Sequence, residues 1–131
     1  MGKIVLEKKS RFDFVKTVES LLAEAGKRNW TIPAVHDLQQ SLAKSGKAVR
    51  PVKVIELCKP EYSGQMLELN DERIISVMMP CRISVYEKDD GLTYIGLINT
   101  THLSSGLPPV IARVMKEAAG ETLEMAAKLS E

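Results

Sequence analysis

Apolar residues recur every three or four positions near both ends of the chain, which is the spacing of one face of an α-helix. The first such segment predicts a helix over residues 11–25, opened by a capping box of Ser10 and Asp13 and ended by Gly26. The second predicts a helix over residues 109–128. Each helix has one apolar stripe, so we expect each to pack against a single surface.

Between these helices lie short runs of strand length, separated by turn residues. The stretches KIVLEKK, WTIPAVHDL and PVKVIELC each predict a strand, and Pro33 indicates an edge or a bulge for the second. CRISVYE and LTYIGLIN predict an antiparallel hairpin, because the Asp-Gly pair between them supplies the positive φ angles of a tight turn. Residues 72–79 satisfy neither the helical nor the strand period, so helix and strand both stay open there.

Two shorter helices are predicted between the strands. Asp37 stands at the N-cap position of LQQSLAKSG, and Pro60 suits the first turn of the other helix. The resulting order predicts an α+β fold with a single antiparallel or mixed sheet of about 4-5 strands, covered on one face by two long helices plus shorter helices. The chain has no repeats or linkers, and its length suits a single domain over residues 1–131.

Charge and hydropathy exclude several classes of protein. The 18 basic and 17 acidic residues are interspersed and give a net charge of +1, so no basic stripe predicts nucleic-acid binding. No stretch approaches the roughly 20 apolar residues that cross a bilayer, and the start has no apolar leader core. We therefore expect a soluble, cytoplasmic protein without a membrane partner, in which the two cysteines are thiols.

Polar residues at strand ends are the candidates for a site, since loops there place side chains on a rigid scaffold. His36 and Asp37 follow the second strand, Cys58 ends the third, and Cys81 and Arg82 open the hairpin. The ligand-binding candidates are His36, Asp37 and Arg82, and the catalytic candidates are Cys58, Cys81 and His36. The structural alternative is a helix cap for Asp37, a hydrogen-bonded histidine, and cysteines that fill the core.

The two cysteines have one further property. Cys58 ends a strand and Cys81 begins one, so antiparallel pairing of these strands would bring the residues together. With α-carbons within about 7 Å, the thiols could form a disulfide, relay a persulfide, or present a thiolate whose charge Arg82 favours.

Metal ions and cofactors are not expected. A Cys₂His₂ zinc set from Cys58, Cys81, His36 and His102 lacks the close pairs of ligands, about two to four residues apart, that structural zinc sites use. No glycine-rich phosphate loop is present. Methionines are more typical of adaptable core than of a copper(I) site, which applies here to Met66, Met78, Met79, Met115 and Met125.

Three blocks of the sequence, VHDLQQSLAKSGK, RPVKVIELCKPEYS and MPCRISVYEKDDG, resemble the domain-of-unknown-function 302 family of small prokaryotic proteins. The resemblance covers about residues 30–99. It implies an α+β fold with a sheet backed by two long helices, commonly paired as a homodimer. It implies no activity.

Three functional hypotheses follow. The first is a homodimeric module that binds a small ligand in a pocket near His36, Cys58, Cys81 and Arg82. The second is a thiol-based redox or persulfide-carrying protein, or an enzyme, that uses Cys58 and Cys81. The third is a structural or interaction homodimer without chemistry. The sequence specifies no reaction and does not decide between enzyme and binding protein.

Overall fold

The computed structural model describes residues 4–103 and 106–131, and five strands of this part form one antiparallel sheet. Its order is β1-β5-β4-β3-β2, and every neighbouring pair is antiparallel. The strands are β1 (Val5–Lys9), β2 (Val35–Asp37), β3 (Val52–Leu57), β4 (Cys81–Glu87) and β5 (Thr93–Ile98). The predicted α+β class is confirmed, and of the two predicted sheet types, antiparallel and mixed, the sheet is antiparallel. Lys3 of the first predicted strand lies outside the described residues.

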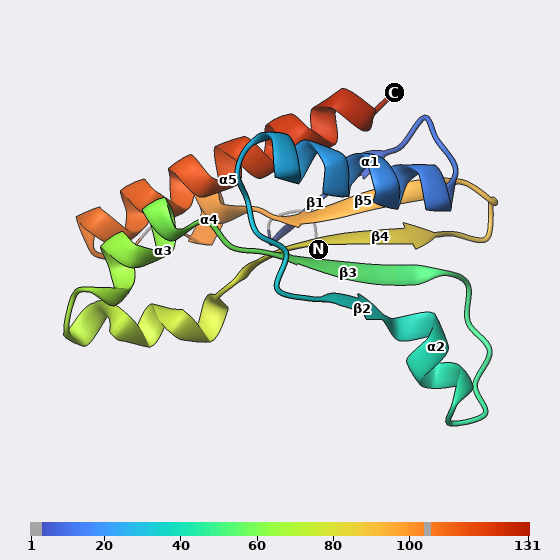
Figure 1. Cartoon of the computed structure of the whole chain (residues 1–131), viewed down its shortest axis with the longest axis horizontal. Coiled ribbons are helices and arrows are strands. Elements are labelled where there is room, and N and C mark those ends of the chain that lie inside the picture. The colour runs from blue at the N-terminus through green and yellow to red at the C-terminus, as the bar shows by residue number, and fades with distance from the viewer. Residues whose placement is uncertain (1–3, 104–105) are drawn as a thin grey trace.

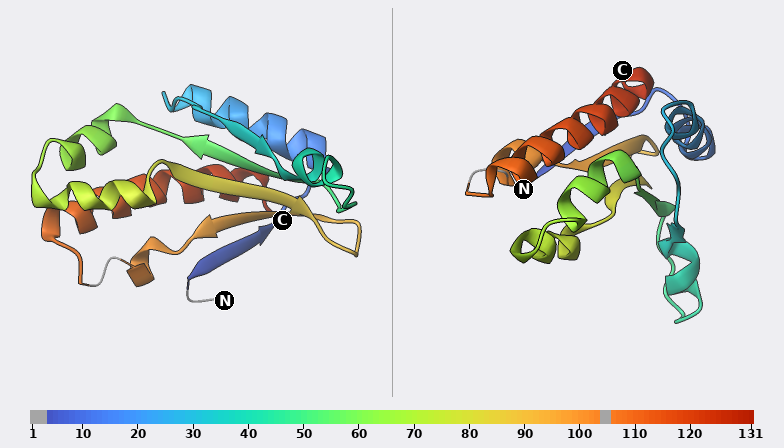
Figure 2. Two further views of the ribbon diagram at one scale, coloured as in Figure 1. Left: turned by 90° about the horizontal axis from the view of Figure 1, so that it is seen from below. Right: turned by 60° about the vertical axis from the view of Figure 1, so that its left-hand side comes forward.

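Two long helices, α1 (Phe14–Lys27) and α5 (Pro109–Leu129), cover one face of this sheet (Figure 1). The opposite face carries no long helix (Figure 2). The shorter helices are α2 (Leu38–Ala43), α3 (Pro60–Leu67), the 3₁₀ helix η1 (Asp71–Met78) and α4 (Thr100–Leu103). No helix within the described ranges is long and apolar enough to span a bilayer.

Strand alternation explains the main core. Every second residue of the central strands points toward the long helices, and these side chains are at most 4% exposed: Ile55, Leu57, Ile83, Val85, Ile95 and Leu97. They pack against the apolar stripes of α1 and α5, which include Val18, Leu21, Ala25, Met125, Ala126 and Leu129. Removing this surface from water is the main driving force for the fold.

A second apolar group lies at one end of the molecule, where α3 and η1 pack against the start of α5 (Figure 1). We call it the end cluster, and it consists of the buried residues Met66, Ile75, Ile111 and Val114. Residues 72–79, for which the sequence pattern left helix and strand open, lie almost entirely in the 3₁₀ helix η1, which spans Asp71–Met78. Helix α5 therefore contributes to both the main core and the end cluster.

The predicted ends of the first helix are wrong. Asp13 caps α1 by accepting from the backbone N–H of Lys16 at 2.8 Å. The hydroxyl of Ser10 instead lies in the core, 2.7 Å from that of Thr17. At the other end the helix runs past Gly26, and the left-handed residue is Asn29 with φ of 64°. Ser10 cannot begin a helix because its backbone continues β1 and donates to the carbonyl of Thr93.

The second predicted strand is shorter than its pattern indicates. Only Val35–Asp37 pair with β3, and Thr31 makes an isolated bridge with Cys58. Pro33 lies between these two pairings and has no N–H to donate to a ladder. β2 forms one edge of the sheet, as Pro33 indicates.

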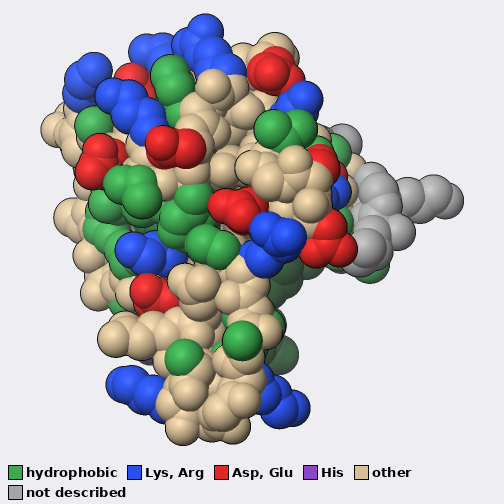
Figure 3. Space-filling view, turned by 90° about the vertical axis from the view of Figure 1, so that its right-hand side faces the viewer, with side chains coloured by type: hydrophobic (Ala, Val, Ile, Leu, Met, Phe, Trp, Pro, Cys, Tyr) green, Lys and Arg blue, Asp and Glu red, His purple; other side chains and the backbone are tan. Residues whose placement is uncertain are grey.

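Helix α2 and the loop after it form an arm that projects from the body of the molecule. No residue of α2 is buried, and residues 41–50 are all exposed. Figure 3 shows the arm as a narrow lobe that carries basic side chains near its tip. It also exposes Leu38, Leu42 and Val49.

Candidate functional site

A partly open cavity lies where the ends of β3 and β4 meet α3, η1 and α5. Its volume of about 80 Å³ is room for several water-sized molecules or a small ligand group. The walls are mainly apolar and include Trp30, Leu57, Met66, Ile75, Met78 and Met115. Polar groups reach it from Cys58, Lys59, Ser63, Cys81 and Arg82. An apolar hollow with a few convergent polar groups is the usual form of a small-molecule site.

The register of β3 and β4 brings both cysteines to this cavity. Leu57 faces Cys81 across the two strands, and Cys58 is the next residue along. Facing α-carbons lie about 5 Å apart and consecutive ones 3.8 Å, so the α-carbons of Cys58 and Cys81 are about 6 Å apart. Both residues are free thiols, partly buried, and both line the cavity.

Burial raises the pKa of the Cys81 thiol above its ordinary value, and the nearby Cys58 raises it further. The sequence suggested instead that Arg82 would favour a thiolate at its neighbour. Arg82 does not do so, because its side chain is half exposed and lies 3.8 Å from the carboxylate of Glu56. Cys81 is therefore a neutral thiol near pH 7, and the Cys58 sulfur lies 3.8 Å from the hydroxyl of Ser63.

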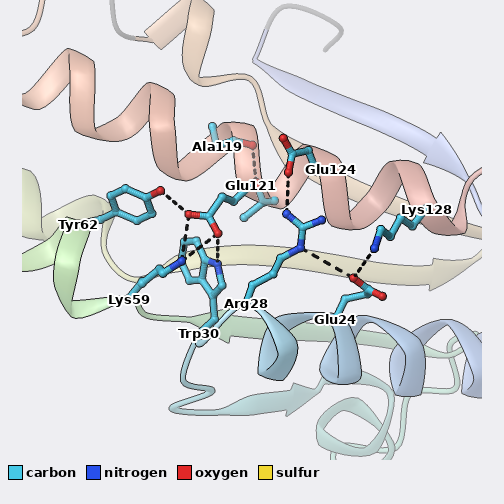
Figure 4. A network of polar contacts seen from close by, with 10 residues as sticks. Glu24, Arg28, Trp30, Lys59, Tyr62, Ala119, Glu121, Glu124 and Lys128 are labelled. Carbon is cyan, nitrogen blue, oxygen red and sulfur yellow. Dashed lines mark hydrogen bonds and ion pairs between the residues drawn. The ribbon is translucent and has the colours of Figure 1, made fainter.

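A carboxylate that the sequence analysis missed holds three residues of the cavity wall, although it does not line the cavity itself. Glu121 of α5 accepts hydrogen bonds from the indole Nε1 of Trp30 at 3.1 Å and from Lys59 Nζ at 3.0 and 3.2 Å (Figure 4). It also accepts one from the hydroxyl of Tyr62. The Lys59 ammonium lies over the rings of Trp30 and Tyr62, 5.7 and 5.6 Å from their centres. This network ties α3 and the strand ends to α5.

Both acidic groups of this network have shifted pKa values. The hydrogen bond to Glu121 raises the pKa of the Tyr62 hydroxyl to about 12. Partial burial alone would raise the pKa of Glu121, but the hydrogen bonds from Tyr62, Lys59 and Trp30 together outweigh it and the pKa is lowered. Near neutral pH the network therefore holds a charged carboxylate and a neutral phenol.

Two sequence candidates lie away from the cavity. His36 is half exposed on the open face of the sheet, where its Nε2 is 2.9 Å from the Glu56 carboxylate. Asp37 caps α2 by accepting from the N–H of Gln40 at 2.9 Å. Neither residue lines the cavity, whereas Arg82 does and also contacts Glu56. The structure thus brings together Cys58, Cys81 and Arg82 and separates them from the other two candidates.

The sequence analysis considered a four-residue zinc set and did not favour it. Within the part of the chain that the structure describes, no three His, Cys, Asp or Glu side chains converge as metal ligands. His36 belongs to the other face of the sheet from the cysteine cavity.

These features define a class: an α+β protein with one antiparallel sheet, two long helices on one face, and an apolar cavity at the strand ends. The family model for the domain of unknown function DUF302 matches residues 6–129, so the chain belongs to that family. This range extends beyond both sides of the resemblance over residues 30–99 and includes both long helices.

A solved structure has the same fold. The crystal structure of the uncharacterized conserved protein DUF302 from Bacillus stearothermophilus is similar with a TM-score of 0.85, covering 96% of this chain and 98% of that chain. The two sequences are 17% identical, so the likeness extends to the fold alone. No curated protein matches this chain. Function must therefore be argued from the site.

Proposed function

We propose that the chain is a binding module for a small, largely apolar ligand held in the cavity between the strand ends and helices α3, η1 and α5. The observation that supports this most directly is the cavity itself, with apolar walls and a few polar groups. Lys59 is already paired with Glu121, whereas the half-exposed Arg82 has a single carboxylate at 3.8 Å. Arg82 is therefore the better candidate to orient a polar end of the ligand.

A thermal-shift screen of metabolites, thiols and anions tests this proposal. We expect at least one class to raise the melting temperature of the wild type. Ala119 lines the cavity, so Ala119→Leu fills it and should abolish the shift. Ala127→Leu adds the same volume at an exposed position of the same helix and should keep the shift.

Two polar variants locate the ligand. Arg82→Ala should reduce the shift, whereas His36→Ala should respond like the wild type because His36 does not line the cavity. If the ligand-induced melting shift were lost in His36→Ala but kept in Ala119→Leu, the ligand would bind on the open face of the sheet and not in the cavity. A screen without any shift would favour the structural hypothesis instead.

We further propose that the module is a homodimer whose copies meet through the open sheet face. This face carries a hollow lined by Val5, Val54, Tyr86 and Ile98, and Val5 and Ile98 are each 39% exposed. Sheets commonly pack face to face over such apolar side chains. Sedimentation at micromolar concentration should give a dimer for the wild type and a monomer for Val54→Glu. The control Val15→Glu alters a side chain that is 63% exposed on α1, and should remain a dimer.

The thiol-based alternative is favoured by one observation, that Cys58 and Cys81 line the same cavity. Mild oxidation with diamide would remove two electrons and two protons from the pair and form one disulfide, which mass spectrometry detects. The raised pKa of Cys81 opposes a reactive thiolate at neutral pH. The predicted cytoplasmic location would keep both thiols reduced at rest. Alkylation by iodoacetamide only after denaturation would identify both as core thiols.

A further inference from the structure

Sulfur is concentrated in one place in this molecule. The chain has six methionines and two cysteines. Six of these side chains line the cavity described above: Cys58, Met66, Met78, Met79, Cys81 and Met115. They come from the end of β3, from α3, from η1 and the residues after it, from β4 and from α5. The fold thus collects thiols and thioethers that are dispersed in the sequence.

We propose that this cavity binds copper(I) through the sulfurs of Cys58 and Cys81, with a methionine thioether as a third ligand. The inference goes beyond the proposed function, since it assigns a metal ion, and not an apolar organic ligand, to the same cavity. Thiolate and thioether sulfurs are soft ligands, and soft ligands select Cu(I) over harder divalent ions. Cu(I) accepts two or three sulfur ligands, so it does not need the four-ligand set that zinc requires and that the described residues do not assemble.

The two cysteines meet where β3 ends. Their α-carbons are about 6 Å apart, but successive side chains of a strand point to opposite faces, so strand pairing alone does not bring the sulfurs together. Cys58 lies just after the last residue of β3, its sulfur is 3.8 Å from the hydroxyl of Ser63 on α3, and both cysteines line the same cavity. Met79 is separated from Cys81 by one residue and lines the same cavity, so a thioether is available beside the thiols. Sequence spacing did not favour this site because its ligands are brought together by the fold, not by a short motif.

The charge balance is also favourable. Two thiols that bind Cu(I) as thiolates release two protons and leave a complex of net charge −1. Arg82 and Lys59 both line the cavity and supply positive charge near it.

Anaerobic titration with Cu(I) against a chromophoric Cu(I) chelator tests the inference. We expect one Cu(I) per chain for the wild type. Cys58→Ser and Cys81→Ser should each weaken binding by more than about 100-fold, since each removes a direct ligand. Met125 is buried in the main core and does not line the cavity, so Met125→Leu is the matched control and should bind like the wild type.

X-ray absorption of the copper-loaded wild type gives an answer that needs no variant to fold. Sulfur as the nearest neighbour of copper, together with protection of both cysteines from iodoacetamide, is the expected result. Nitrogen or oxygen neighbours, binding that survives in the Cys58→Ser/Cys81→Ser double variant, or no binding to the wild type would overturn the inference. An organic ligand found in the thermal-shift screen alongside any of those results would leave the proposed function standing.

Discussion

At the scale of single residues, Glu121 shows how one carboxylate can hold a cavity wall. Its side chain is 19% exposed and accepts hydrogen bonds from Trp30, Lys59 and Tyr62. These donors come from different parts of the chain, and hydrogen bonds to a charged acceptor are stronger than those between neutral groups. Loss of the charge should therefore weaken the junction between α5, α3 and the strand ends.

We predict that Glu121→Gln lowers the free energy of unfolding at pH 7 by about 1.5–3 kcal/mol, measured by urea denaturation. The folded pKa lies below the ordinary value of 4.5, so the contribution is complete above about pH 4.5 and is lost as the pH falls through the lower folded value. Wild type and Glu121→Gln should thus converge in acid.

A matched control lies one turn along the same helix. Glu124 is 67% exposed and pairs with Arg28 at 2.6 Å, so Glu124→Gln removes only a surface ion pair. It should cost at most about 1 kcal/mol. If the two variants lost equal free energy of unfolding, the Glu121 network would stabilise the fold no more than a surface ion pair does.

The sequence predicted some of the site residues and not others, for physical reasons. Cys58 and Cys81 could be placed near one another only on the condition that their strands pair, because run patterns predict strands but not the order of strands in the sheet; the structure pairs β3 with β4. His36 was grouped with the cysteines because it also stands at the end of a predicted strand, but it pairs with β3 and its side chain is half exposed beside Glu56, away from the cavity. Glu121 gave no signal, because an acidic residue on an amphipathic helix resembles any solvated one.

At the scale of elements, two aspartates make the same cap in different surroundings. Asp13 caps α1, which contributes Val18, Leu21 and Ala25 to the main core. Asp37 caps α2, which buries no residue. Loss of the Asp13 cap should therefore lower the stability of the whole fold, whereas loss of the Asp37 cap should destabilise only the arm.

We predict that Asp13→Ala lowers the free energy of global unfolding by about 1 kcal/mol. Asp37→Ala should raise amide exchange within residues 38–43 and leave global unfolding nearly unchanged, since the arm opens independently of the core. Denaturant titration and hydrogen exchange measure the two effects. A global loss from Asp37→Ala equal to that from Asp13→Ala would mean that the arm is coupled to the core.

Periodicity predicted the long helices because burial of one stripe dictates their sequence. It did not predict where they end, since Ser10 belongs to the sheet and Asn29 takes the left-handed turn. The hydrophobic period also could not decide whether residues 72–79 form a helix or a strand. Ile74 and Val77 are 79% and 80% exposed there, so only part of the apolar pattern reports burial.

At the scale of the whole molecule, α5 joins two apolar groups of different size. The main core lies under α1 and α5, and the end cluster lies under α3 and η1. The cavity lies between them, with walls from both groups, because Leu57 and Ala118 belong to the core and Met66 and Ile75 to the end cluster. The small end cluster should open more easily than the core, which would allow the partly open cavity to widen around a ligand.

We predict that native-state hydrogen exchange shows residues 60–79 opening at lower free energy than strands β3, β4 and β5. Ile83→Ala, at a core position that is 0% exposed, should lower the free energy of global unfolding by about 2–5 kcal/mol. Ile75→Ala should act mainly on the local opening of residues 60–79, because its contacts lie in the end cluster. If Ile75→Ala reduced protection equally in β3, β4 and β5, the molecule would unfold as one unit, and α3 and η1 would not move independently of the core around the cavity.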